Sequence, residues 1–527
     1  MRHLPWRFIV GSVALAGCNP SVADYCSPGS PECSATDAAA GDAGRDGGAE
    51  AEVAPSGCDP TKPPHDESCV IDDAFGIFVS PAGSDGDPGS KSAPTQTIGH
   101  GMDLAKAAAK RVYICAGSYP EQLVVGASRD GVNAYGALDC ATWTYGAANR
   151  VVVAPAQSGY ALEIEGLQTG VTFEDLEFDA QSAANVGASS VAVFVSDSQN
   201  VALNRTTIVG GSGSDGMPGP PQGPSNWYGT PPNYSELNGI SAGDAGGAPS
   251  SICTCPDQAS SIGGAGGGPM NIPSPTAGQP SYGDAGAGAA GMNATQCNLR
   301  GGGSNGGDAP AAVADTPSTS LGSCSSTGWT PDFGVSGAHG RPGQGGGGGG
   351  NGTLSSGSGG SGACGGCGGW GGQGGAGGGS SIALLLFQSS IALADCTLTA
   401  GAAGNGGAGG SGEQGQTGGG GGSGFPPGNQ TSSGCPGGAG GGGAGGNGGQ
   451  GGPGGLSLGI GYVGTPPTVD GAVVTQASTH SGVTMGAAGA GGAGGFRGAS
   501  ATNSTGPAGA LGASGQPGVA AAVEAVP

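Results

Sequence analysis

The sequence predicts an all-β solenoid, and three observations lead to that prediction. Residues 160–181 and 191–211 repeat one scheme in which apolar residues alternate with polar ones, as in strands with one buried face. A third copy follows at 381–401, after a long Gly-rich stretch. Gly accounts for 124 of the 527 residues and aromatic residues for 5%, so much of the chain cannot build an ordinary core. Repeated strand units of this kind bury their apolar faces against their neighbours.

The chain opens with a targeting signal. Arg2 and Arg7 precede a short apolar run at 8–16, and residues 15–18 read Leu-Ala-Gly-Cys. This order resembles the lipobox of bacterial lipoproteins, which implies that 1–17 is a signal peptide and that Cys18 is acylated. Asn19 in place of Asp favours an outer-membrane or cell-surface location under the enterobacterial sorting rule. The alternative is an ordinary cleaved signal peptide.

Charge and cysteine usage agree with export. The chain has 14 Lys and Arg against 37 Asp and Glu, a net charge of -23, which disfavours nucleic acid as a partner. Of 15 Cys, 14 remain if Cys18 is lipidated, an even number compatible with disulfides in an oxidising compartment. The candidate local pairs are Cys26 with Cys33, Cys58 with Cys69, Cys115 with Cys140, Cys253 with Cys255 or Cys297, and Cys364 with Cys367.

Residues 18–73 are rich in Ala, Gly, Asp, Glu and Pro, and we expect a disordered stalk there. The folded part begins with a strand at 76–79, followed by a helix that Thr95 or Thr97 caps. Further strands are expected at 111–115 and 121–125, with a turn between them.

Two segments on either side of the helix read FVSPAGSDGDPGSKSAPTQTI and VYICAGSYPEQLVV. With them, the stretch from Phe75 to Val125 resembles the opening of bacterial right-handed parallel β-helix proteins related to pectate lyases. The resemblance implies a right-handed parallel β-helix with an N-terminal capping helix over the open end of the stack. Gly99 and Gly101 in the helix and Cys115 in the strand depart from the family pattern.

The rung pattern divides the rest of the chain. Val171 and Phe173 are expected to stack on Val201 and Leu203, with Ile391 one rung further. Long Gly-rich insertions should leave one corner of the stack, and we expect them to be irregular and disordered rather than packed as extended threefold Gly helices. They resemble the PE-PGRS surface proteins in Gly content only, and they are not collagen, for which Gly at every third position with frequent Pro would be needed. The predicted segments are a β-helix at 74–211, an insertion at 212–380, rungs at 381–399, an insertion at 400–455, rungs at 456–485 and a Gly- and Ala-rich tail at 486–527.

Candidate sites are few. The candidate residues of a lyase or hydrolase are Glu174, Asp175, Glu177 and Asp179, with Asp197, Arg205 and Asp395 on neighbouring rungs. Alternation puts Glu174 and Asp175 at a corner and Glu177 and Asp179 on the outer strand face, where a polysaccharide lyase or hydrolase of this fold would carry its carboxylates. A solvated acidic face is the simpler explanation of these residues. Asp215 lies in a segment that fits a calcium nonapeptide, so calcium is a possible cofactor, but no tandem copy supplies further ligands. Cys364 and Cys367 lack a second Cys pair or a His at zinc-ligand spacing.

The sequence therefore predicts a lipid-anchored surface protein with a structural, adhesive or polysaccharide-binding role. The alternative is a polysaccharide lyase or glycoside hydrolase that uses the acidic face near Glu177 and Asp179.

Overall fold

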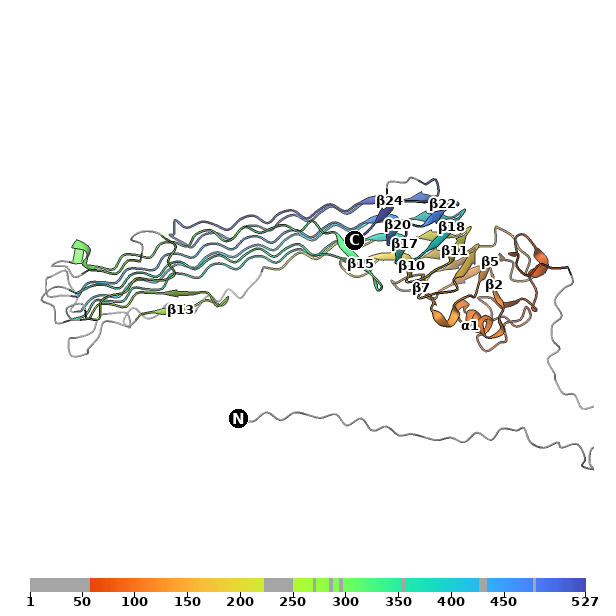
Figure 1. The fold of residues 1–527 in the computed structure, drawn as a ribbon, viewed down its shortest axis with the longest axis horizontal. Coiled ribbons are helices and arrows are strands. Elements are labelled where there is room, and N and C mark those ends of the chain that lie inside the picture. Colours follow the sequence, from red (N-terminus) through yellow and green to blue (C-terminus); the bar gives the residue numbers. More distant parts are fainter. Residues whose placement is uncertain are drawn as a thin grey trace, which may run out of the picture. The chain divides into compact units, whose positions relative to one another are not determined.

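The computed structural model describes residues 57–221, 250–268, 272–283, 288–292, 297–351, 357–425, 434–476 and 480–527. They belong to one compact unit, Glu52–Pro527 (Figure 1). Residues 18–56 of the predicted stalk, with Cys18, Cys26 and Cys33, lie outside the described part of the chain. Among the described residues, no helix has the length and apolar character needed to cross a membrane.

Three parallel sheets form the body of the protein, as a parallel β-helix requires. The first sheet runs β1 (Gly76–Val79), β2 (Arg111–Cys115), β5 (Ala134–Leu138), β8 (Val171–Glu174), β11 (Val201–Asn204), β18 (Ile391–Ala394), β21 (Thr468–Val469) and β22 (Ala472–Val473), and only the last pair is antiparallel. The second runs β4 (Leu123–Val125), β7 (Leu162–Glu165), β10 (Ser190–Ser196), β17 (Ser381–Phe387), β20 (Ser457–Val463) and β24 (Ala520–Ala525). The third runs β3 (Gly117–Tyr119), β6 (Val151–Val153), β9 (Glu177–Asp179), β12 (Thr207–Val209), β19 (Thr397–Thr399) and β23 (Val483–Thr484).

The predicted stacking of equivalent residues is confirmed. Leu203 pairs with Phe173 on one side and with Leu393 on the other, so rungs on either side of the long insertion are direct neighbours. The ring of Phe173 packs edge-on against Phe178, with centroids 5.8 Å apart, and both side chains are fully buried. The apolar core therefore continues along the whole stack, as a solenoid requires.

Helix α1 (Ile98–Ala108) covers the first rungs, as predicted. Thr97 caps it by accepting from the His100 N–H at 3.3 Å. Glu121 adds a second cap, because its carboxylate accepts from the N–H groups of Ile98 at 2.7 Å and Gly99 at 3.1 Å. A Cβ on Gly101 would lie 2.5 Å from Val79, so close packing on β1 explains the glycine at this position of the helix.

Three boundaries differ from the prediction. The expected turn at 116–119 contains strand β3, and the tail ends in strand β24, which pairs in parallel with β20. The predicted stalk is also shorter than 18–73, because residues from Gly57 onward pack on the β-helix. Val70 is fully buried and accepts a hydrogen bond from the Tyr113 hydroxyl. Short 3-10 helices lie at Ser68–Val70 and Ala127–Arg129.

A hairpin within the first insertion covers the outer face of the second sheet. Its strands are β15 (Gly322–Ser325) and β16 (Gly328–Pro331). Trp329 packs there in an apolar cluster with Phe194, Leu385 and Leu458. The insertion therefore contributes to the core. Its other elements are the antiparallel pair β13 (Ile252–Thr254) and β14 (Ser260–Ile262), and a π-helix at Cys297–Gly301.

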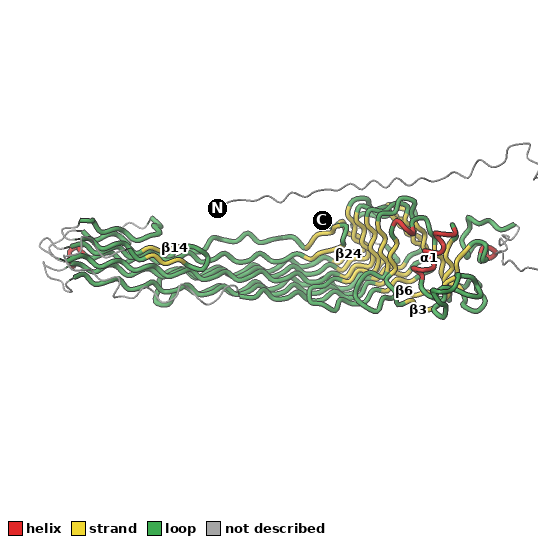
Figure 2. Tube along the Cα trace, turned by 90° about the horizontal axis from the view of Figure 1, so that it is seen from below, coloured by secondary structure: helices red, strands yellow, loops and turns green. Residues whose placement is uncertain are grey.

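The Gly-rich insertions leave the β-helix at one corner, as predicted. Each follows a strand of the third sheet (β12, β19 or β23) and returns into a strand of the second (β17, β20 or β24). The outgoing and returning segments run side by side beyond the strands (Figures 1 and 2). We call these segments the glycine bundle. Its described members are 210–221, 263–268, 303–309, 334–351, 357–380, 400–425, 434–456 and 486–519.

The expectation that these insertions are irregular is wrong for the described residues, because every third residue hydrogen-bonds to the same neighbour. This period is that of an extended threefold helix, which makes no hydrogen bonds within itself. Residues 404 to 425 pair in this way with the antiparallel segment 358–379. The donors Gly404, Gly407, Gly410, Glu413, Gln416, Gly419, Gly422 and Phe425 bond to the carbonyls of Gly379, Ala376, Gln373, Trp370, Cys367, Cys364, Ser361 and Ser358.

Neighbouring segments also pair in parallel, which makes the bundle layered. Outgoing segments are linked by bonds such as Gly406 N–H to Ala490 O, and returning segments by bonds such as Gly372 N–H to Asn447 O. The pairing of β17 with β20 passes into the bundle without a break, since Gly378 donates to Pro453 and Ser381 to Leu456. The β-helix therefore sets the register of the bundle.

Three disulfides cross-link the bundle. Cys253 pairs with Cys364, Cys255 with Cys367, and Cys297 with Cys435, so the predicted local pairs among these cysteines are wrong. Cys364 and Cys367 lie one threefold turn apart and point toward the same neighbouring segment, which explains why each bonds to a distant cysteine. The structure also pairs Cys58 with Cys69 and Cys115 with Cys140. Among the described cysteines, Cys324 and Cys396 are free.

Candidate functional site

Charged residues gather at a corner of the β-helix where successive rungs turn. Asp175, Arg205, Asp395 and Asp470 each follow a strand of the first sheet, and all four have positive φ, between 47° and 59°. Asp tolerates this left-handed conformation better than most residues. The four turns are stacked, since Asp175 N–H donates to Asn204 O, Arg205 N–H to Ala394 O and Asp470 N–H to Leu393 O.

Arg205 is at the centre of the charged groups in this corner. Its guanidinium donates to Asp175 through Nε and Nη2, both at 2.9 Å, and to Glu174 through Nη2 at 2.7 Å. Glu174 is buried and also accepts from Asn204 at 2.8 Å. Partial burial alone would lower the pKa of Arg205, but the hydrogen bonds and charges of Asp175 and Glu174 raise it above its ordinary value.

The N-terminal segment adds His65 to this corner. His65 Nδ1 lies 3.0 Å from Arg205 Nη2 and 3.6 Å from Glu174, and its Nε2 lies 3.0 Å from Asp66. The side chains of His65, Glu174 and Asp175 lie close enough to hold a metal ion. Arg205 already provides a positive charge within hydrogen-bonding distance of all three, so the geometry is that of an ion-pair network.

Glu177 and Asp179 flank buried Phe178 on β9, on the outer face that the sequence predicts for them. Glu177 forms an ion pair with Arg150. Burial, and then the negative charge of Glu177, raise the pKa of Asp179 above its ordinary value. Glycosidases use a pair of carboxyl residues as acid and as base or nucleophile, and these two residues are of that type. Two cavities of about 140 and about 180 Å³ are lined by other residues of the described chain.

Asp215 binds the protein's own backbone. Its carboxylate accepts from the Asn405 N–H at 2.6 Å, and the Asn405 side chain accepts in turn from the Ala490 N–H at 2.9 Å. The two side chains therefore link three outgoing segments of the glycine bundle. This role explains the aspartate without calcium.

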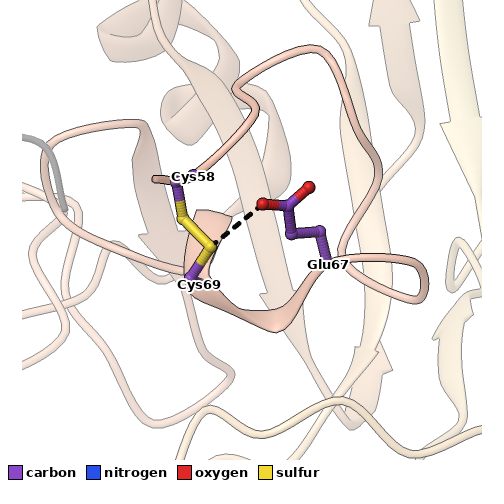
Figure 3. A group of neighbouring side chains, drawn as sticks. All are labelled: Cys58, Glu67 and Cys69. Carbon is purple, nitrogen blue, oxygen red and sulfur yellow. Dashed lines mark hydrogen bonds between the residues drawn. A yellow bond between two sulfur atoms is a disulfide. The ribbon is translucent and has the colours of Figure 1, made fainter. Parts of the chain in front are cut away.

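A second close group of possible metal ligands contains Cys58, Glu67 and Cys69 (Figure 3). The two cysteines form a disulfide, so neither sulfur is a thiolate that could bind a metal. Glu67 lies 3.3 Å from the Cys69 sulfur and accepts from the Asp59 N–H at 2.9 Å. The group closes the loop that carries His65.

Sequence reasoning listed Glu174, Asp175 and Arg205 on neighbouring rungs, and the structure brings them together. Sequence reasoning did not connect His65 to these residues, because His65 and Arg205 are 140 residues apart in the chain. Asp395 is in the adjoining turn, where its N–H donates to Asp470 at 2.9 Å.

Comparisons with known proteins add little to this geometry. A scan against models of protein families finds no match, and neither does a search of curated proteins. Among solved structures, a rhamnogalacturonan lyase matches with 17% identity and a TM-score of 0.12. The match covers 26% of this chain and 39% of the lyase chain. A likeness of this size carries no argument about fold or activity. The structure itself defines the class of protein, which is a parallel β-helix with a glycine bundle.

Proposed function

We propose that this chain is a lipid-anchored protein of the outer membrane or cell surface with a structural or adhesive role. In this proposal the β-helix, which resembles those of the pectate lyase group, is a scaffold that holds the glycine bundle. The supporting observation is the unbroken register from β17 and β20 into the bundle. Five disulfides among the described residues suit an oxidising compartment outside the cytoplasm.

The ligand we propose is surface polysaccharide, bound along the outgoing segments of the bundle. On these segments, side chains at every third position are exposed, among them Ser411, Gln414 and Phe496. Phe496 is 77% exposed. Exposed aromatic rings beside amide and hydroxyl groups suit the apolar faces and hydroxyls of sugars.

Sedimentation with insoluble polysaccharides, including pectin, cellulose, chitin and peptidoglycan, tests this ligand class. We expect the wild type to co-sediment with at least one of them and Phe496→Ser to lose at least fivefold in retention. Val473→Ser, which removes a 67% exposed apolar residue from the β-helix, is the matched control and should bind normally. Equal retention of wild type and Phe496→Ser would reject the bundle as the binding surface.

The second candidate function is a polysaccharide lyase or glycoside hydrolase, and the raised pKa of Asp179 beside Glu177 favours it. The same glycans serve as substrates. Release of unsaturated or reducing sugars that is abolished in both Asp179→Asn and Glu177→Gln would establish the enzyme. Turnover unchanged in these variants would exclude this pair as its active site.

A further inference from the structure

The two ends of the stack differ in how they are closed. Helix α1 covers the first rungs, whereas β24 is the last strand of the second sheet and pairs only with β20 among the described strands. The first sheet closes with the antiparallel turn from β21 to β22. Gln476 donates to the Glu524 side chain at 2.7 Å, and the Cys324 N–H donates to Pro527 O at 2.8 Å, but no described strand pairs with the outer edge of β24. Such an edge presents unpaired N–H and C=O groups to a partner.

The open edge continues from β24 into the last layer of the glycine bundle, residues 486–500 and 506–519. In the layer before it, Gly451 donates outward to Ala513 O, and Ser457 donates to Val519 O. The β20–β24 register pairs Ser457 with Ala520, an offset of 63 residues, and the same offset makes Ser514 the equivalent of Gly451. The Ser514 N–H therefore points away from the bundle and has no backbone partner in the described chain.

In strand β24, too, some backbone N–H groups point away from the neighbouring strand. Val526 donates back to Tyr462 O at 3.0 Å, so the N–H of the preceding residue, Ala525, points away from β20. The strand consists of four Ala, one Val and Glu524, without the Lys, Pro or bulge that commonly protects an edge. In the adjoining segment Leu511 is 65% exposed, and Pro517 interrupts the row of outward N–H groups at one position.

We infer that this edge, residues 506–525, is the contact between two copies of the chain in a twofold dimer. A twofold axis sets each edge antiparallel to its copy, so the same donors and acceptors meet in reverse order. Extended segments of this sequence accept that geometry, since segment 506–519 already pairs antiparallel with 486–500 through bonds such as Gly512 N–H to Gly495 O. The dimer repeats between chains the antiparallel pairing that joins the outgoing and returning segments within one layer of the bundle.

The size of the edge fits a specific interface. Twenty residues at about 3.2 Å each give a strip of about 60 Å, and at about 10 Å of width each copy buries about 600 Å². The total of about 1,200 Å² is at the lower limit for stable protein pairs. Closed twofold symmetry also stops growth at two copies. The end of each stack that α1 covers stays free.

The test measures the mass of the exported chain carrying Cys18→Ser, so that no lipid drives association. Light scattering after gel filtration, from about 1 to about 100 µM, should show about twice the monomer mass. The double variant Ser514→Pro, Ala525→Pro removes two outward donors. Both positions are extended, and the N–H groups that bond inward remain. We expect at least a tenfold weaker dimer. Met217→Ser, a 59% exposed residue of the first outgoing segment, is the control and should dimerise as the wild type does.

Circular dichroism and thermal unfolding of the double variant must match the wild type, and Ala525→Pro alone provides a second variant if they do not. A wild type that stays monomeric up to about 100 µM overturns the inference. So does a dimer that persists in a folded proline variant, or a ladder of higher oligomers. None of these results depends on polysaccharide binding, so the proposed function is tested separately.

Discussion

Gly409 and Gly449 lie so close together that a Cβ on Gly409 would be 1.9 Å from the carbonyl oxygen of Gly449. Contacts of the same kind recur throughout the bundle. For example, a Cβ on Gly366 would lie 1.8 Å from Gln416 O. Only glycine allows backbones to approach this closely. The glycine content is therefore a packing requirement of the bundle.

Substituting Gly409 should destabilise the protein. We expect Gly409→Ala to lower the free energy of unfolding by about 2 kcal/mol or more, because the methyl group must displace a backbone carbonyl. Ser411→Ala, on the exposed side of the same segment, should change it by less than about 0.5 kcal/mol. Urea denaturation of both variants measures the difference. Equal stabilities would show that the two segments do not touch.

Removing Phe173 should weaken the rung stack. Phe173 is fully buried between Leu203 and Ala134 on neighbouring strands, so Phe173→Ala should cost about 3–5 kcal/mol. Phe173→Asp should disrupt the stack altogether, since it buries an unpaired charge. Thr172→Ala, whose side chain is on the other face of β8, is the control. Thermal unfolding of Phe173→Asp at the wild-type temperature would contradict the core assignment.

Glu121 should make the stability depend on pH. Burial raises its pKa above the ordinary 4.5 despite its hydrogen bonds to Ile98 and Gly99. Because the folded pKa is the higher one, the contribution of this carboxyl to stability is complete below about pH 4.5 and is lost as pH rises through the folded pKa. The stability of wild type relative to Glu121→Gln should therefore fall as pH rises from about 4.5 through the folded pKa.

Chemical denaturation at several pH values measures this difference, with Glu165→Gln, an exposed residue of β7, as the control for loss of one charge. A wild-type advantage that grows with pH would mean that the hydrogen bonds outweigh burial.

The disulfides of the bundle should be detectable and stabilising. Peptide mapping without reduction should recover Cys253 linked to Cys364 and Cys255 linked to Cys367. Replacing both cysteines of the first pair by Ser should cost about 2–4 kcal/mol and speed proteolysis within 357–425. The matched pair Cys58→Ser, Cys69→Ser should leave that region resistant. Recovery of Cys364 linked to Cys367 would contradict the bundle geometry.

The proposed lipid anchor depends on Cys18. We expect radiolabelled palmitate to enter the wild type in cells and to be absent from Cys18→Ser, because acylation needs the thiol. Cys26→Ser is the control and should be labelled. An unlabelled wild type recovered in the soluble fraction would refute the lipoprotein assignment.

The β-helix could be predicted from the sequence because its signal is local. Alternating apolar residues mark each strand, and the spacing of Val171 and Val201 gives the register that the structure shows. The helix and its Thr97 cap follow from equally local patterns. The contact of His65 with Arg205 could not be predicted, since it joins residues 140 positions apart.

The order of the glycine bundle was missed for a physical reason. A segment without side chains has no apolar face, so the usual periodicities of two and 3.6 residues are absent. A period of three was nevertheless present, with glycine at each third position from Gly434 to Gly455. The sequence does not specify which Gly-rich segment pairs with which. Each segment bonds to segments that are distant in the chain, and the register of the β-helix strands selects these partners.

Hydrogen exchange read by mass spectrometry on residues 400–425 and 434–455 tests the ordered bundle most directly. Because amides at every third position of these segments donate to neighbouring carbonyls, we expect protection comparable to that of β17 and β20. Exchange of these amides at the rate of an unfolded chain would contradict the bundle.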